Sequence, residues 1–208
     1  TQPLPIGGVS IVVITVAALT GTLKIGEAIS GFANSAIWLI VGAFLFSRGF
    51  IKTGLGKRIA YNLIAAFGSS SLRLSYALAL SDLILAPATP SNTARVGGVI
   101  MPITTSLAKA FGSEPQDGPR KIGSFLMQSI YQVNTITSAM FQTSMAGNTL
   151  VAALALQSFG IGITWGDWAM AAIVPGIIAL IIMPYFIYKV YPPEIKDARE
   201  AQQMIREE

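Results

Sequence analysis

Long apolar runs alternate with short polar or glycine-rich segments along the chain. Three of the runs, at residues 6–23, 33–51 and about 168–190, have the length of membrane-spanning helices. A helix needs about 20 apolar residues to cross a hydrocarbon core that is roughly 30 Å thick. The runs therefore predict three spanning helices, the first of them slightly short. The segment KTGLGKRIAYNLIAAFGSSS, residues 52–71, is too short and too polar to cross, and it predicts an amphipathic helix at the membrane surface.

Residues 83–103, LILAPATPSNTARVGGVIMPI, place a polar turn and a charge between two apolar arms. The first arm covers about residues 74–88 and the second about residues 94–111, so each helix would measure only about 22–26 Å. Both outer ends are polar or basic, at residues 69–73 and 109–121. Arms of this length favour a re-entrant hairpin, with its tip in the middle of the membrane, over two full spans.

From residue 122 to residue 166 the chain contains no charged residue. One helix of that length would measure about 68 Å, more than twice the thickness of the bilayer core. The run must therefore be interrupted, and Gly, Asn, Ser and Thr cluster at residues 142–148, QTSMAGN. This cluster predicts a broken transmembrane helix.

Composition supports a membrane protein and excludes several kinds of site. Only 12% of the residues are charged and 52% are hydrophobic, with a mean hydropathy of +0.61. A soluble domain usually carries about a quarter charged residues, so these values predict an all-α integral membrane protein. Cysteine and histidine are absent, which excludes disulfides, thiolate metal sites and imidazole-based triads from this chain. With no nucleophile–base pair, metal cluster or phosphate loop in the sequence, we expect no enzymatic activity.

The net charge of +4 is explained by membrane topology rather than by a nucleic acid partner. Most lysines and arginines lie in residues 52–73, 109–121 and 189–208, which share one side of the membrane in the predicted topology. Positively charged loops stay on the cytoplasmic side, so these three segments are predicted to be cytoplasmic.

The hairpin tip offers groups that suit both an anion and a cation. The second arm begins near Asn92 or Thr93, so its free N–H groups and the positive end of its dipole point to the membrane centre. Ser91, Asn92 and Thr93 also supply hydroxyl and carbonyl oxygens that suit Na⁺. Irregular backbone at this depth occurs only inside protein or beside a water-filled cavity. The tip is therefore a candidate binding site, unless these three residues only cap the helix.

Three other polar features leave two interpretations each. The cluster at residues 142–148 forms either part of a substrate and ion site or a polar contact between helices. Arg95 either attracts a dianionic substrate or pairs with Asp82, which lies about 6 Å away along the facing arm. The remaining polar residues of the charge-free run either line a cavity or form an interhelical network; they are Gln128, Gln132, Asn134, Thr135, Thr137 and Ser138.

The stretch SDLILAPATPSNTARVGGVIMPI resembles the first signature hairpin of the divalent anion:sodium symporter family. The likeness is greatest to its branch of 2-oxoglutarate/malate translocators and citrate/succinate antiporters. It runs from about residue 31 to about residue 198 and includes SGFANSAIWLIVGAFLFSRGFIKTGLGKRIAYNL, PRKIGSFLMQ, SAMFQTSMAGN and YKVYPPEIKDA.

This resemblance implies a homodimeric secondary transporter with an elevator mechanism, in which a transport part slides against a dimerising scaffold. Di- or tricarboxylates would bind between two Ser-Asn-Thr-like tips, one from each of two inverted repeats, either with Na⁺ or by exchange. The resemblance assigns Asn92 and Thr93 to the carboxylate. It assigns to the ion Ser91, Asn92, Ser144, Ala146, Gly147 and Asn148. Many family members have proline where this chain has Gly147, so the pattern is looser there.

Only one hairpin and one interruption are present, so the resemblance also implies that this chain is the N-terminal repeat and lacks the other. The implied parts are a scaffold with the surface helix at residues 1–68, a transport part at 69–191 (hairpin 72–111, broken helix 121–160, spanning helix 168–190) and a cytoplasmic linker at 192–208. We expect a bacterial inner membrane, with a plastid inner envelope as the alternative. The expected partners are membrane lipid, a second copy and the C-terminal repeat, and no cofactor is expected apart from Na⁺. An anion channel and a non-transporting membrane scaffold are the alternative functions.

Overall fold

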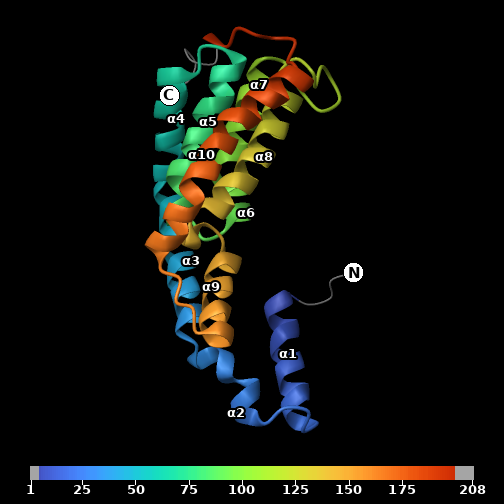
Figure 1. Ribbon diagram of the computed structural model, residues 1–208. Helices are drawn as coiled ribbons and strands as arrows, with labels where there is room; N and C mark the ends of the chain where they lie inside the picture. Colours follow the sequence, from blue (N-terminus) through green and yellow to red (C-terminus); the bar gives the residue numbers. More distant parts are fainter. Residues whose placement is uncertain (1–4, 200–208) are drawn as a thin grey trace. The chain divides into compact units, whose positions relative to one another are not determined.

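The computed structural model describes residues 5–199, and helices form most of this range (Figure 1). No strand occurs within residues 5–199, where the extended pairing consists of an isolated bridge between Ser70 and Asp197. The predicted all-α class is therefore confirmed. By its internal contacts the chain forms two units, Thr1–Val41 and Gly42–Glu208.

The first unit contains α1 (Ile6–Leu19), α2 (Ile25–Ala28), a 3₁₀ turn (Ser30–Ala33) and the beginning of α3 (Ser35–Thr53). α1 carries no charged residue, and none of its residues is buried. Its 14 residues measure about 21 Å, which is shorter than the bilayer core.

The second unit contains the rest of α3 and the helices that carry the predicted site. These are α4 (Leu55–Phe67), α5 (Ser71–Leu85), α6 (Asn92–Arg95), α7 (Met101–Ala110), α8 (Gly123–Met140), α9 (Ala146–Phe159) and α10 (Trp165–Val190). A π-helical turn joins α6 to α7, so both belong to the second of the two predicted arms. Residues 141–145 separate α8 from α9 within the charge-free run, and they overlap the predicted segment 142–148. That the two helices form one broken transmembrane helix stays a prediction.

Local sequence signals explain where these helices begin and end. The hydroxyl groups of Ser70 and Ser91 accept backbone N–H bonds at the first turns of α5 and α6. Thr164 and Asp167 form a reciprocal capping box at the start of α10. α9 ends at Gly160, whose φ of 68° is in the left-handed region that glycine tolerates best.

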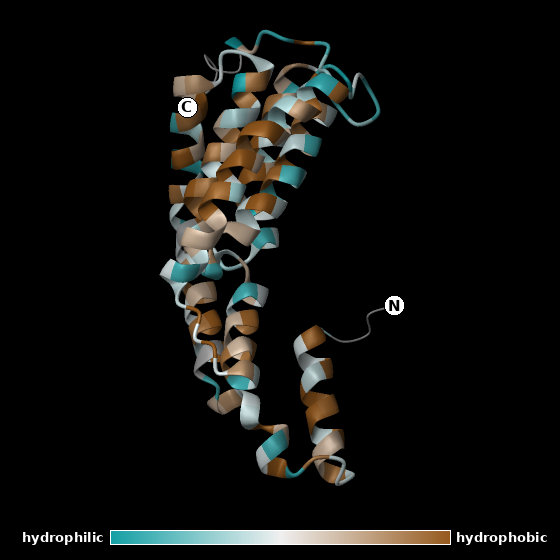
Figure 2. Cartoon of the chain, in the orientation of Figure 1, coloured by the Kyte–Doolittle hydropathy of each residue, from teal (hydrophilic) through white to brown (hydrophobic). Residues whose placement is uncertain are grey.

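α5, α7, α8 and α10 pack around one hydrophobic core. Leu74 and Leu78 of α5, Leu107 of α7 and Phe125 and Leu126 of α8 are fully buried in it or nearly so. The buried residues of α10 include Gly176, Leu180 and Ile187 at helical spacing, while its other faces expose large apolar side chains. Ile187 joins this core, whereas Leu180 packs in a second, smaller cluster with Val133 and Met140 of α8. Figure 2 shows the consequence: α10 is mostly hydrophobic, whereas hydrophilic residues gather in the connections at one end of the unit.

α4 packs along α5 through one face. Its buried residues are Gly56, Ala60 and Ile64, which recur every four positions and so form one stripe. At Gly56 an added Cβ would lie 3.2 Å from both methyl carbons of Val99. α4 is therefore in close contact with the π-helical turn between α6 and α7 at this point. The placement of α4 at a membrane surface stays a prediction.

Within residues 5–199, α10 is the one helix that is by itself long and apolar enough to cross a bilayer. The bent pair Ile37–Thr53 and Leu55–Phe67, which meet at 59°, would qualify as a single broken span. The predicted spans near residues 33–51 and 168–190 correspond to α3 and α10.

The segment after α10 is tied by its backbone to the outer ends of two other helices. We call residues 191–198 the strap. Ser71 N–H donates to Lys196 O (3.0 Å) beside α5, and Ile195 N–H donates to Lys121 O (2.9 Å) just before α8. At its start the Arg120 guanidinium lies 4.7 Å from the Tyr191 ring centroid. The rest of the predicted linker, from residue 200, lies outside the described residues.

We predict that Gly176→Ala destabilises the fold, because an added Cβ would lie 2.6 Å from Met140 Cγ and 2.7 Å from its Sδ and Cε. Met140 is only 2% exposed and has little room to move. The expected loss is about 1–3 kcal/mol of unfolding free energy, read as a lower thermal midpoint of the detergent-solubilised full-length protein. Gly49→Ala is the control, because a Cβ there meets no described atom within 4 Å. Equal midpoints for the two variants would contradict the prediction.

Candidate functional site

The hairpin tip comprises the 3₁₀ turn (Ala86–Ala88), the irregular residues 89–91 and the start of α6 at Asn92 and Thr93. Ser91 Oγ accepts the N–H of Ala94 (3.2 Å), and Asn92 Oδ1 accepts the N–H of Thr93 (2.8 Å). Ser91 therefore caps α6, as the simpler interpretation required, whereas the bond of Asn92 stays within the first turn of the helix. Ser91 and Asn92 are half-buried and Thr93 is exposed, so all three also present polar atoms at the surface of this unit.

The interruption between α8 and α9 satisfies the carbonyl groups at the end of α8 with side chains. Asn148 Nδ2 donates to Ser138 O (2.7 Å) and Phe141 O (3.0 Å), and the Ser144 hydroxyl lies 2.7 Å from the same two oxygens. Trp168 Nε1 of α10 donates to Ala139 O (2.9 Å). These bonds matter because the last carbonyls of a helix have no partner within it.

The tip and the interruption are in direct contact. Ala146 N–H, at the start of α9, donates to Pro90 O (3.0 Å). The Thr143 hydroxyl donates to Pro87 O (2.7 Å) and accepts the indole N–H of Trp165 (3.0 Å). The structure thus brings together the two polar segments that were predicted to form one site.

Arg95 lies at the centre of this junction and is 1% exposed. A guanidinium has five N–H donors. Nε donates to the Asp82 carboxylate (2.8 Å), Nη1 to the carbonyls of Thr89 (3.0 Å) and Ser144 (3.1 Å), and Nη2 to the hydroxyls of Thr137 (3.3 Å) and Ser138 (3.0 Å). Every N–H therefore has an acceptor in the protein.

The ion pair of Arg95 with Asp82 is one of the two interpretations that the sequence left open, and the structure shows it. The second oxygen of Asp82 accepts bonds from Asn134 Nδ2 (3.3 Å) and from the Thr137 hydroxyl. Because all five N–H groups of Arg95 are engaged, none is left to bind a substrate anion directly.

The assignment of individual residues to carboxylate or ion stays a prediction. The assigned residues of the interruption differ in burial and in which of their polar groups are already hydrogen-bonded within the protein. Ser144 is fully buried, and its hydroxyl and carbonyl oxygen both bond within the junction. Asn148 is buried and uses its amide N–H groups there, which leaves its Oδ1 as an acceptor. Ala146 and Gly147 are half-buried, and the backbone N–H of Ala146 bonds to the tip at Pro90 O.

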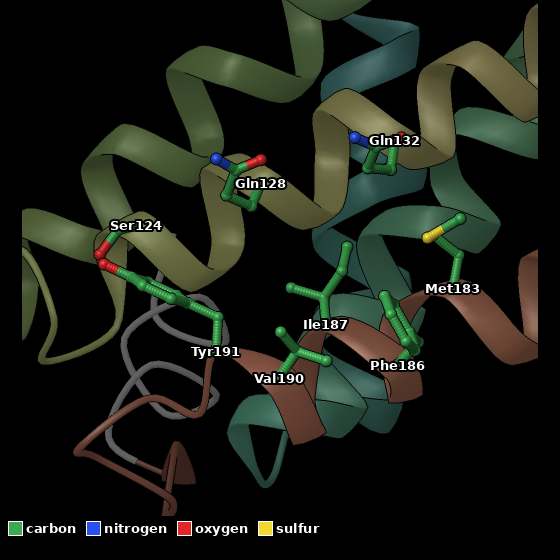
Figure 3. A pocket seen from close by; sticks show the side chains of 8 residues that line it. All are labelled: Ser124, Gln128, Gln132, Met183, Phe186, Ile187, Val190 and Tyr191. Carbon is green, nitrogen blue, oxygen red and sulfur yellow. The ribbon is translucent and has the colours of Figure 1, made fainter.

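The polar residues of α8 lie in two different environments. Asn134, Thr137 and Ser138 join the network around Arg95, whereas Gln128 and Gln132 line a cavity of about 530 Å³ between α8 and α10 (Figure 3). Apolar α10 side chains such as Met183 and Phe186 form its opposite wall. Thr135 is exposed and bonds back to its own helix. The network and the cavity, predicted as alternatives, thus occupy different halves of the helix.

Sequence reasoning missed the part that Thr143 and Ser138 play at the junction. In the sequence, Thr143 is simply one member of the polar cluster at residues 142–148, and Ser138 is one of several polar residues in the charge-free run. The available signal was that Ser138 lies in the last turn of a long helix, just before the cluster, and that Thr143 lies within the cluster.

We predict that Asp82→Ala is strongly destabilising, because it leaves the buried guanidinium of Arg95 without its anion. The expected loss is about 3–5 kcal/mol of unfolding free energy, measured by thermal unfolding of the full-length protein in detergent. The control is Asp197→Ala, which removes an exposed pair with Arg199 (3.6 Å) and should cost no more than about 1 kcal/mol. Similar losses for the two variants would show that burial does not strengthen the inner pair.

Comparison with known proteins identifies the family. Residues 1–208 match the family model described as "Sodium:sulfate symporter transmembrane region". The chain is 56% identical over 208 residues to the "Putative malate transporter YflS" of Bacillus subtilis (strain 168), covering 100% of the chain and 44% of that protein. It is 49% identical over 208 residues to "Dicarboxylate transporter 1, chloroplastic" of Spinacia oleracea, covering 100% of the chain and 37% of that protein.

A third relative, "Inner membrane protein YbhI" of Escherichia coli (strain K12), is 51% identical over 176 residues, which is 85% of the chain and 37% of that protein. The chain thus spans less than half the length of these relatives. The resemblance predicted from the sequence is confirmed. Because the model matches the whole chain, the chain belongs to the family of the sodium:sulfate symporter transmembrane region.

Proposed function

We propose that this chain is part of a secondary active transporter that carries dicarboxylates such as malate or 2-oxoglutarate across a membrane. Relatives are named as malate and dicarboxylate transporters, and these names indicate transporters rather than enzymes. The observation that carries the proposal is the junction of two interrupted helices, where Ala146 bonds to Pro90. Discontinuous helices that meet in the membrane form the substrate and ion sites of secondary transporters. Succinate and the tricarboxylate citrate are further candidate cargoes.

In this proposal α5 and α6–α7 form a re-entrant hairpin, α8 and α9 form one broken transmembrane helix, and α10 spans the membrane. The large apolar side chains exposed on α9 and α10 support it, because such surfaces are stable against lipid or further protein. The bonds at the junction also support it, since backbone groups at mid-membrane depth must find partners inside the protein.

The cargo carboxylate would bind at Asn92 and Thr93. The ion Na⁺ would be held by oxygens from Ser91 and Asn92 on one side and from the segment Ser144 to Asn148 on the other. The available oxygens fit a hard cation: Asn148 Oδ1, the Ser91 hydroxyl and Asn92 Oδ1, which accepts two short-range bonds within its own turn. Arg95 would contribute through the structure of the junction rather than by direct contact.

The whole transporter would be a homodimer with two inverted repeats, and this chain would supply the first. Residues 1–68 would belong to the dimerising scaffold, residues 69–191 to the elevator part that moves, and residues 192–208 to the linker between the repeats. A bacterial inner membrane is the proposed location, in keeping with the printed name of the Escherichia coli relative.

We predict that the full-length protein, reconstituted in liposomes, takes up labelled malate faster when the lumen contains unlabelled dicarboxylate. Such acceleration identifies an exchanger, and acceleration by an inward Na⁺ gradient identifies a symporter. Steady current without either gradient or counter-substrate would instead show an anion channel. The absence of flux from a stable, membrane-inserted protein would leave only a scaffold role.

We predict that Asn92→Ala lowers malate uptake about tenfold or more, because it removes the amide that in this proposal would contact both the carboxylate and the ion. The matched control is Asn62→Ala, which changes an exposed asparagine on α4 and should leave uptake unchanged. Uptake is measured per amount of reconstituted protein, with dimer content checked by size exclusion. Equal uptake by the two variants would remove Asn92 from the proposed site.

A further inference from the structure

One nitrogen atom of Arg95 joins the two sides of the candidate site. Nη1 donates one N–H to Thr89 O on the hairpin tip (3.0 Å) and the other to Ser144 O in the interruption (3.1 Å). The two N–H bonds of this nitrogen lie in the guanidinium plane at a fixed angle. The two carbonyl groups are therefore held at one separation for as long as both bonds are made.

The guanidinium itself cannot turn, because its other donors are held by two different helices. Nε is bonded to Asp82 of α5 (2.8 Å), and Nη2 to Thr137 (3.3 Å) and Ser138 (3.0 Å) of α8. Side-chain exposure of 0% for Arg95 and 2% for Asp82 excludes bulk water from competing for these bonds. The plane of the guanidinium is thus fixed by bonds to α5 and α8, independently of the carbonyl groups of the tip and the interruption.

We propose that Arg95 is a positioning residue that sets the separation between the hairpin tip and the interruption, and so the relative placement of the two segments that carry the proposed site residues. This inference rests on the proposed function for the identity of the cargo, but not for the geometry. It also means that the tip and the interruption move as one body, so access to the site is not controlled by opening one from the other.

Lysine separates the charge of this residue from its geometry. Arg95→Lys keeps a cation that can pair with Asp82, but an ammonium has three N–H groups on one atom and cannot reach all five acceptors. The carbonyls of Thr89 and Ser144 would then lose their common donor. Arg73→Lys is the matched control, because Arg73 is exposed and its guanidinium donates to a neighbouring side chain of the same segment, Ser69 Oγ (3.1 Å).

The separation is measured by dipolar spectroscopy between spin labels on Ile84→Cys and Leu150→Cys in the full-length protein. Both side chains are exposed, one in α5 near the tip and one in α9 beyond the interruption. This chain has no cysteine, so only cysteines elsewhere in the protein need replacement. We expect a narrow distance distribution in the parent protein and in Arg73→Lys, and a broadened or shifted one in Arg95→Lys. An unchanged distribution in Arg95→Lys overturns the proposal.

Transport kinetics supply the second measurement. Arg95→Lys should raise the KM for malate about tenfold while lowering the maximal rate much less, because the separation of the two segments is altered but the charge pair is kept. A changed distance with an unchanged KM would overturn the claim that this separation governs binding. If the parent protein carries no dicarboxylate, the proposed function fails, whereas the distance measurement still decides the positioning role.

A milder variant covers the case in which Arg95→Lys does not fold. Ser138→Ala removes one of the two acceptors of Nη2 and leaves the ion pair intact. It should broaden the same distance distribution and raise the KM for malate about two- to threefold, since one neutral hydrogen bond is lost. A parent-like distance distribution in this variant would also count against the proposal.

Discussion

The second unit depends on the complete hydrogen bonding of one buried guanidinium. Moving a charged group out of water costs several kcal/mol, and the cost is offset only when partners of good geometry replace the water. Arg95 meets this condition with acceptors from α5, the hairpin tip, α8 and the interruption before α9. Because unmade bonds are costly in such surroundings, the four segments are held in one arrangement rather than in a range of them.

The two interrupted helices solve the same problem for their backbones, and each depends on the other. The interruption places Ala146 N–H on Pro90 O of the tip, while Asn148 and Ser144 occupy carbonyls at the end of α8. Neither irregular segment would be stable alone in an apolar environment, where an unpaired backbone group costs several kcal/mol. The junction is therefore a way of making two polar interruptions compatible with surroundings that exclude water.

The ends of the helices were predictable because local chemistry sets them. α6 begins at Asn92 after a Pro-Ser pair, α8 ends just before the cluster at residues 142–148, and α10 ends before Pro192 and Pro193. Apart from Asp82, the partners of Arg95 were not predictable. Gln128 and Thr137 are equally polar in the sequence, but only the depth and rotation of α8 against α5 bring Thr137 to the guanidinium. The placement of α8 depends on packing between residues that are distant in the sequence, such as Gly176 of α10 against Met140 of α8.

The hydrogen bonds that the strap makes to α5 and to the segment before α8 use its main-chain atoms, and this has a consequence for evolution and for engineering. Its amide and carbonyl groups hold the ends of α5 and α8, while Glu194 and Asp197 have side chains directed to solvent. Such an attachment constrains chain length and direction far more than side-chain identity. Related sequences should therefore drift in charge along this stretch without losing the attachment, whereas a single inserted or deleted residue would pull its bonds out of register.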